Sequence, residues 1–289
     1  MNKFKESRGI GLLIISIIYI LTIILQVLLF KIIDFNNIYF EILLVDIIAT
    51  IFVFVFSLLF KNASIYDPYW SVEPIIIMLT LMLHNKLNNP IVISFAVALG
   101  LWGIRLTINW VTTFKNLNHQ DWRYTMLKEK TKQFYPIVSF LGIHLFPTIV
   151  VFLCMIPMIN FISINFKNYY SYFGIVLMLI GITFQVLADY DIYVYHKRNK
   201  DDRRQILNIG LWKYSRHPNY LGEILLWYGV FFTMLPVSFN NWYFVLGAII
   251  NILMFVFISI PMSEKRLKTY KFNYEQYQED TRMLLPFKK

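Results

Sequence analysis

The sequence predicts an all-α membrane protein: a polytopic bundle of about seven or eight transmembrane helices, with both termini in the cytoplasm. Hydrophobic residues make up 57% of the 289 residues and charged residues only 15%, whereas a soluble domain is about half apolar and about a quarter charged. Long apolar runs alternate with short polar segments, and basic residues concentrate in every second segment. These three observations indicate a single integral membrane domain over residues 1–289.

The apolar runs give the expected position of each span, because a helix needs roughly 20 apolar residues to cross a bilayer. Two spans lie within residues 10–60, and the first is retained, since Lys31–Asp34 offers no signal-peptide cleavage site. The short run Pro74–Leu83 is expected to be tilted, extended by its polar flanks or re-entrant. In chain order the runs are Ile10–Phe30, Ile42–Phe60, Pro74–Leu83, Pro90–Val111, Ile137–Ile159, Tyr172–Tyr195, Tyr220–Leu235 and Trp242–Ile260.

The basic residues predict the orientation. With eight spans and the N-terminus inside, only Lys31, Lys86 and Lys167 fall in outer segments and Arg105 falls inside a span, while the other Lys and Arg residues lie in inner segments. Cytoplasmic loops are the ones that carry such an excess. The net charge of +10 then reflects topology and anionic lipid headgroups, or a polyanionic ligand at the cytoplasmic face. The bases are spread among short loops, so nucleic acid is not an expected partner.

Two absences restrict the chemistry. The chain has one cysteine, Cys154, which excludes an intrachain disulfide and a cysteine-based zinc site, and no metal site is expected. No Gly-rich Rossmann or P-loop fingerprint occurs in the sequence, so any nucleotide site must be built in another way.

The most polar stretch beside an apolar segment is Gly210–Glu223. Polar groups at the edge of a hydrocarbon layer need partners, and such a cluster is by default a functional site. Pro218 suits the first turn of a helix, which places Asn219 and Glu223 four residues apart on one face. N–H groups at a helix start favour an anion. Basic residues that would suit a phosphate-bearing nucleotide gather here: Lys197, Arg198, Lys200, Arg203, Arg204, Lys213 and Arg216.

Polar residues within the expected spans have two interpretations each. Arg105 either extends to the headgroups or faces the bundle interior as a ligand or ion-pair partner. Gln185 and Asp189, one helical turn apart, either form a polar helix end or bind an amide, a ribose hydroxyl or an arginine. Isolated polar residues are expected to pack or pair within the bundle; they are Gln26, Asp46 and His144.

Three polar segments contain further candidates. The loop Tyr66–Pro74 holds Asp67 and Glu73 among aromatic residues. Burial in such a pocket raises the pKa of a carboxyl group and makes it a plausible proton donor. The loop Asn118–Tyr135 is a headgroup-lying segment or a lid. The tail Ser263–Lys289 is rich enough in aromatic residues that we expect it to fold back onto the cytoplasmic face.

Several of these residues resemble a known family. Ser215–Glu223, at the centre of Gly210–Gly229, resembles the C-terminal signature of the steroid 5-alpha-reductase superfamily. The likeness is closest to its uncharacterised branch of small multi-pass proteins, which share a loop like Asp67–Trp70, and Arg282–Phe287 resembles the ending of the steroid reductases. Sterol reductases and isoprenylcysteine carboxyl methyltransferases have related motifs. The resemblance covers about residues 64–289 and is specific at the superfamily level.

The resemblance implies a bundle that binds NADPH from the cytoplasm and a lipid substrate from within the membrane. Asn219 and Glu223 match residues that contact the nicotinamide half of the cofactor. Asp189 and Tyr270 resemble further cofactor contacts. Asp67 takes the approximate place of the catalytic glutamate that polarises a substrate carbonyl, although the glutamine beside that glutamate has no counterpart here.

One family residue is replaced. Trp102 falls near the place of the catalytic tyrosine and cannot act as an acid, so Tyr66 or Tyr124 is expected to substitute. The full set of expected cofactor-binding residues is Arg105, Asp189, Arg203, Arg204, Lys213, Tyr214, Arg216, His217, Asn219, Tyr220, Glu223 and Tyr270.

These observations lead to a hypothesis with two alternatives. We expect an NADPH-dependent reductase of an activated C=C bond in a lipid, with membrane lipids as surroundings and no obligate protein partner. The first alternative is a methyltransferase that uses S-adenosylmethionine on an isoprenoid or phospholipid. The second is a non-catalytic membrane scaffold. Glu223 and the Asp67–Trp70 loop favour the reductase.

Overall fold

A computed structural model describes residues 3–199, 202 and 204–287. Over this part of the chain the structure is helical and has no strand. Seven helical segments are long and apolar enough to cross a membrane, which confirms the predicted fold class. They are Arg8–Ile32, Ile38–Phe60, Pro90–Thr113, Trp122–Ile164, Ser171–Arg198, Pro218–Val237 and Phe239–Tyr270. The orientation of the termini stays a prediction.

The eighth expected span is a shorter helix. The run Pro74–Leu83 lies within α3 (Tyr69–His84), which has 16 residues and is therefore shorter than the roughly 20 residues that a span needs. The chain divides into two compact units: residues 1–88 with 99–163, and residues 89–98 with 164–289. The helix α4 (Pro90–Thr113) has residues in both.

The first unit contains α1 (Arg8–Ile32), α2 (Ile38–Phe60), α3, α5 (Trp122–Thr131), α6 (Tyr135–Ser139) and α7 (Phe146–Ile164). Polar side chains begin several of these helices. The side chains of Asn37 and Asp121 accept backbone N–H groups at the starts of α2 and α5, because the first turn of a helix has donors without intrahelical partners. Lys61 ends α2 in the left-handed region, with φ of 56°.

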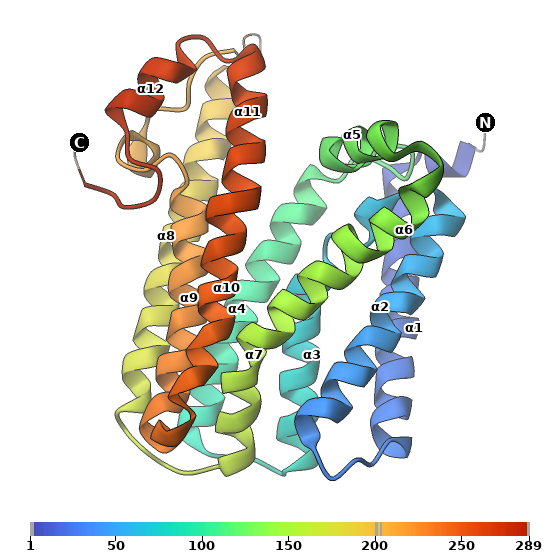
Figure 1. Cartoon of the computed structure of the whole chain (residues 1–289), viewed down its shortest axis with the longest axis vertical. Helices are drawn as coiled ribbons and strands as arrows, with labels where there is room; N and C mark the ends of the chain where they lie inside the picture. The colour runs from blue at the N-terminus through green and yellow to red at the C-terminus, as the bar shows by residue number, and fades with distance from the viewer. Residues whose placement is uncertain (1–2, 200–201, 203, 288–289) are drawn as a thin grey trace. The chain divides into compact units, whose positions relative to one another are not determined.

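The second unit contains α8 (Ser171–Arg198), α9 (Pro218–Met234), α10 (Leu246–Met254), α11 (Ile260–Tyr270) and α12 (Tyr274–Asp280). Figure 1 shows α8 and α9 side by side. Glycines allow this close approach: a Cβ atom on Gly181 would lie 2.5 Å from the carbonyl oxygen of Gly222, and one on Gly229 would lie 2.7 Å from that of Gly174. Small residues at such contacts are common between membrane helices.

The C-terminal tail folds back, as the sequence predicts. The helix α12 follows α11, and the residues after it return to the segment before α9. Ser215 and Arg282 form a parallel β-bridge, in which the backbone N–H of Arg216 donates to the carbonyl of Arg282 at 2.9 Å. The tail is therefore part of the folded second unit.

Candidate functional site

The second unit contains a cavity of about 250 Å³ next to the signature segment. The ends of α8 and α11, the segment before α9, the first turn of α9 and the helix α12 contribute its walls. Six aromatic side chains line it: Tyr195, Trp212, Tyr220, Tyr270, Tyr274 and Tyr277. The cationic, histidine and neutral polar residues of the lining are His196, Arg216, His217, Lys271, Asn219 and Ser263.

The segment before α9 is anchored to α8. A 3₁₀-helix covers Gly210–Lys213, and Gly210 has φ of 53°, a conformation that glycine adopts without strain. The backbone N–H of Leu211 donates to Asp191 Oδ2 at 3.0 Å, and Trp212 Nε1 donates to the carbonyl of Ala188 at 3.1 Å. These contacts place the indole ring of Trp212 in the cavity wall.

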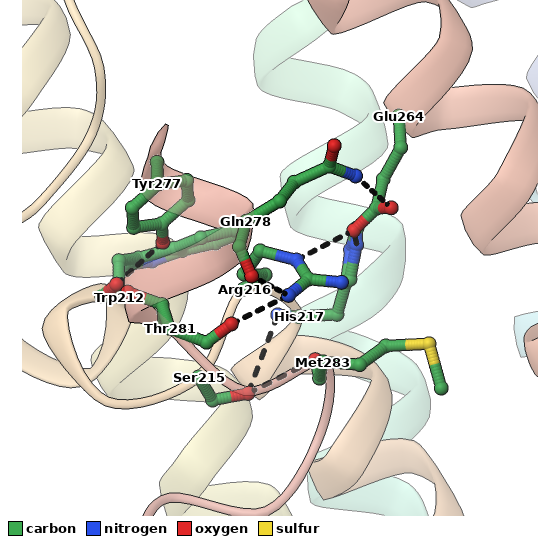
Figure 2. A network of polar contacts seen from close by, with 9 residues as sticks. All are labelled: Trp212, Ser215, Arg216, His217, Glu264, Tyr277, Gln278, Thr281 and Met283. Atoms are coloured by element: carbon green, nitrogen blue, oxygen red, sulfur yellow. Dashed lines mark hydrogen bonds and ion pairs between the residues drawn. The ribbon is translucent and has the colours of Figure 1, made fainter. Parts of the chain in front are cut away.

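Arg216 lies at the centre of a polar network that we call the Arg216 network: Arg216, His217, Glu264, Gln278 and Thr281 (Figure 2). Arg216 Nε donates to Glu264 Oε1 at 2.8 Å, and its NH1 group donates to the carbonyls of Gln278, at 3.0 Å, and Thr281. His217 Nε2 contacts the same Glu264 oxygen at 3.0 Å. The side chain of Arg216 is only 10% exposed, so this guanidinium is largely satisfied within the protein.

The first turn of α9 contributes the ring of Tyr220 and the side chain of Asn219 to the cavity lining. The ring of His217 is stacked on that of Tyr220, with centroids 5.3 Å apart, and Tyr220 is stacked on Phe255 at 4.6 Å. Asn219 Oδ1 is inaccessible to solvent and has no hydrogen-bond partner among the described residues. A buried acceptor without a donor is costly, so a ligand donor at this position would be stabilising.

Lys271 provides positive charge in the cavity lining. Its Nζ donates to Tyr195 Oη at 2.9 Å and to the carbonyl of Gln205 at 2.6 Å, and the Tyr195 hydroxyl also donates to Gln205. Nζ lies 4.8 Å from the centre of the Tyr195 ring. These contacts hold the segment around Gln205 against the ends of α8 and α11.

Glu223 lies between α8 and α9. Gln185 Nε2 donates to Glu223 Oε2 at 2.6 Å, and Trp227 Nε1 donates to Oε1 at 2.9 Å. The side chain is buried and is not part of the described cavity lining. The sequence indicated that Gln185 and Asp189 form either a polar helix end or a binding pair, whereas the structure pairs Gln185 with Glu223.

The structure brings together five of the predicted cofactor-binding residues. Arg216, His217, Asn219, Tyr220 and Tyr270 all line the cavity. The other predicted residues with described positions lie outside that lining; they are Arg105, Asp189, Arg204, Lys213, Tyr214 and Glu223. Arg203 lies outside the described residues.

Among the residues outside the lining, Arg204 contacts neighbouring side chains, and Arg105 belongs to the other unit. Arg204 Nε donates to Asp202 Oδ1 at 3.1 Å, and its guanidinium stacks on Phe272. Arg105 belongs to the first unit, in the part of α4 after residue 98.

In the first unit, two of the three predicted catalytic residues are in contact. Tyr124 Oη donates to Asp67 Oδ1 at 2.6 Å. Burial raises the pKa of Asp67 to about 6, opposed by the hydrogen bond from Tyr124 and the charge of Arg123. The third, Tyr66, is buried, and its hydroxyl shares a hydrogen bond with Thr148 at 2.8 Å.

The first unit also contains two further buried carboxyl groups, Asp46 and Glu73, whose partners could not be predicted from the sequence. Gln26 Nε2 donates to Glu73 Oε1 at 2.5 Å, and Tyr69 Oη donates to Asp46 Oδ1 at 2.8 Å. A cavity of about 20 Å³ adjoins Gln26 and Glu73, which is room for about one water molecule. The sequence predicts that Gln26, Asp46 and His144 pack or pair within the bundle, and each has a side-chain partner there.

Glu264 was also not identified as a site residue. Its only signal in the sequence is an acidic residue that follows a long apolar run after the single polar residue Ser263 and precedes Lys265 and Arg266. Glu73 has a comparable signal, since it directly precedes Pro74 within an apolar stretch. In both cases the partner lies more than ten residues away, at Arg216 for Glu264 and at Gln26 for Glu73.

Comparison with known proteins identifies the family. A family model described as "Protein of unknown function (DUF1295)" matches residues 53–281. An uncharacterized protein of Schizosaccharomyces pombe is 25% identical over 209 residues, which cover 63% of this chain and 61% of the relative. No solved structure matches. The resemblance to steroid 5-alpha-reductase-like proteins is confirmed at family level, while the particular branch stays a prediction. The chain belongs to DUF1295, a family of proteins of unknown function.

Proposed function

We propose that this protein is a membrane-embedded reductase that uses NADPH to reduce an activated C=C bond in a lipid such as an enone. The observation on which the proposal depends is the cavity of about 250 Å³ at the signature helix. Its wall combines aromatic rings, positive charge and the unpaired acceptor Asn219 Oδ1. The steroid 5-alpha-reductase-like character of the family supports the same assignment.

The residues of the cavity fit part of a dinucleotide. Pockets for drug-sized ligands measure about 300–1,000 Å³, so this cavity would take one half of NADPH. Aromatic rings such as Tyr220 and Tyr270 suit a flat heterocycle. Asn219 Oδ1 would accept a hydrogen bond from an amide or hydroxyl group, and Lys271 would balance phosphate charge. When bound, NADPH supplies the hydride.

The chain itself would hold a proton for the reaction. Hydride addition to the β-carbon of an enone places negative charge on the carbonyl oxygen, and a proton must then reach the α-carbon. A preorganised hydrogen-bond donor stabilises that charge. Asp67, with a pKa of about 6 and a hydrogen bond from Tyr124, is suited to this role because the ideal pKa of a general acid lies near the working pH.

The substrate is proposed to be a lipid because the protein offers apolar helices to its surroundings. Leu13 and Ile20 of α1 and Val97 of α4 are at least 56% exposed, and helix faces of this kind contact acyl chains in a bilayer. A substrate dissolved in the bilayer would reach the protein through the membrane. We propose that the cofactor enters from the cytoplasm, as the distribution of basic residues predicts.

Thermal unfolding of the detergent-purified protein with NADPH, NADH or S-adenosylmethionine tests the proposal. A ligand that binds only the folded state raises the apparent stability, by about 2.7 kcal/mol at a hundredfold excess over Kd. We expect stabilisation by NADPH that is reduced in Asn219→Ala and retained in the control Asn118→Ala, since Asn118 lies on the exposed surface of the first unit. Stabilisation by S-adenosylmethionine alone would favour the methyltransferase. No stabilisation by any of the three would contradict the reductase.

A further inference from the structure

We propose that Glu264 is a positioning residue of the ligand cavity. Through Arg216 and His217 it fixes the tail 274–283 as a wall of the cavity and orients the ring of Tyr220. The choice of NADPH as test ligand rests on the proposed function, whereas the coupling between Glu264 and the tail does not.

Glu264 is surrounded by three nitrogen atoms from three side chains. Its Oε1 atom accepts from Arg216 Nε at 2.8 Å and contacts His217 Nε2 at 3.0 Å. Its Oε2 atom accepts from Gln278 Nε2 at 2.5 Å. Glu264 is 9% exposed, and charge-assisted hydrogen bonds in such a place are about twice as strong as neutral ones. One carboxylate therefore joins α11 to the signature segment and to α12.

The guanidinium of Arg216 contacts the C-terminal tail as well as Glu264. Besides its bond to Glu264, the guanidinium donates to the carbonyls of Gln278 and Thr281. The sequence predicts that Arg216 neutralises a cofactor phosphate. In the structure its charge is already balanced by Glu264, and its donors are directed at the tail. This arrangement favours a role in holding the tail over direct contact with an anion.

The tail forms part of the cavity wall. Tyr274 and Tyr277 are buried and line the cavity, and Tyr277 Oη donates to the carbonyl of Trp212 at 2.5 Å. The helix α12 has only seven residues, so it is too short to be stable without tertiary contacts. The exposed pair Lys268–Glu275, at 3.5 Å, adds little. The docking of the tail therefore depends strongly on the Arg216 network.

Glu264 is also linked to the cavity through His217 and Tyr220. His217 shares Glu264 Oε1 with Arg216, and its ring is stacked on Tyr220 with an interplanar angle of 5°. Tyr220 lines the cavity beside Asn219. Loss of the Glu264 carboxylate would release the imidazole of His217 and, with it, one face of the cavity.

The test compares Glu264→Ala with Glu275→Ala, a matched loss of a glutamate at an exposed position in the tail. We expect Glu264→Ala to weaken NADPH and NADH by the same factor, about tenfold or more, as for the loss of a charged hydrogen bond. Hydrogen exchange of residues 274–283 should become faster without any ligand. Glu275→Ala should change neither. A role of this network in binding the 2′-phosphate, which NADPH has and NADH lacks, predicts instead a selective loss of NADPH affinity.

A reversible tether separates positioning from a general loss of structure. Ser215 and Arg282 are parallel bridge partners, so Ser215→Cys with Arg282→Cys places two thiols on directly neighbouring backbone segments, and the natural Cys154 is buried. In a Glu264→Ala background the oxidised tether should restore ligand affinity, and reduction should remove it again. Failure of the oxidised tether to restore affinity would overturn the proposal, as would unchanged affinity in Glu264→Ala.

The exchange measurement remains decisive if the wild-type protein binds neither NADPH nor NADH. Unchanged exchange of 274–283 in Glu264→Ala would then overturn the positioning role. Faster exchange in that variant, reversed by the oxidised tether, would support the positioning role even though the proposed function had failed.

Discussion

The two units differ in the partners of their buried polar groups. In the first unit neutral side chains contact buried carboxyl groups, as in Tyr69 with Asp46 and Gln26 with Glu73, or one another, as in Thr50 with Thr148. The cavity beside Gln26 and Glu73 has room for about one water. In the second unit an arginine, a histidine and a glutamate join three segments, and a cavity of about 250 Å³ lies next to them.

This difference assigns different tasks to the units. Buried groups that pair with one another, such as Asp67 and Tyr124, stabilise a bundle. A cavity with the unpaired acceptor Asn219 Oδ1 is suited to a ligand. The second unit combines this open space with very close helix packing at its glycines. Four substitutions test the contrast.

The largest effect is expected at the contact between α8 and α9. A Cβ atom in Gly181→Ala would lie 2.5 Å from the carbonyl oxygen of Gly222 and 2.9 Å from the backbone nitrogen of Leu226, so two backbones must separate. Overpacking typically costs about 1–3 kcal/mol and occasionally more, and we expect the upper end here because two packed backbones must move apart, which thermal unfolding would detect. Gly100→Ala is the control, because a Cβ atom there meets nothing within 4 Å and the helix should gain slightly.

The next effect concerns Glu223. In Glu223→Leu the donors Gln185 Nε2 and Trp227 Nε1 lose their acceptors, and each buried donor left unpaired costs about 1–3 kcal/mol. We expect a lower unfolding temperature together with weaker ligand binding, since the cavity depends on α9. Weaker binding at an unchanged unfolding temperature would instead indicate direct contact of Glu223 with the cofactor.

A smaller effect is expected from Asp67 as the pH changes. Its pKa is about 6 in the folded protein and about 3.9 in an unfolded chain, so between pH 4 and 6 the folded state keeps a proton that the unfolded state releases. The contribution of Asp67 to stability is therefore greatest below about pH 4 and falls as the pH rises to 6, by about 1–2 kcal/mol for this partly exposed group. Asp67→Asn should remove this slope from the pH dependence of unfolding. An identical slope in the variant would contradict the assignment.

The smallest effect is expected from Tyr124→Phe, which should shift the pKa of Asp67. The hydrogen bond from Tyr124 lowers the pKa of Asp67, so Tyr124→Phe should move the midpoint of the stability curve to higher pH. Asp202 provides a contrast of opposite sign, because its contacts with Arg204 lower its pKa, and its contribution is lost as the pH falls. A midpoint that moves to lower pH in Tyr124→Phe would show that the tyrosine does not support the carboxylate.

The sequence alone determined the elements of the fold. Apolar length located seven spanning helices, and Pro218 marked the first residue of α9. The aromatic residues of the tail predicted that it folds back, and Tyr274 and Tyr277 are indeed buried. These features depend on local composition, because solvation of the chain in lipid and the chemistry of helix ends are decided within a few residues.

Only the tertiary structure decided which polar groups meet. Arg216 contacts Glu264, 48 residues away, and Tyr124 contacts Asp67, 57 residues away. Glu223 turned toward Gln185 and Trp227, although its spacing from Asn219 is that of residues on one helix face. A membrane helix is apolar on most of its circumference, so periodicity does not determine how it is rotated. The rotation is set by contacts with its neighbours, such as the glycines of α8 and α9.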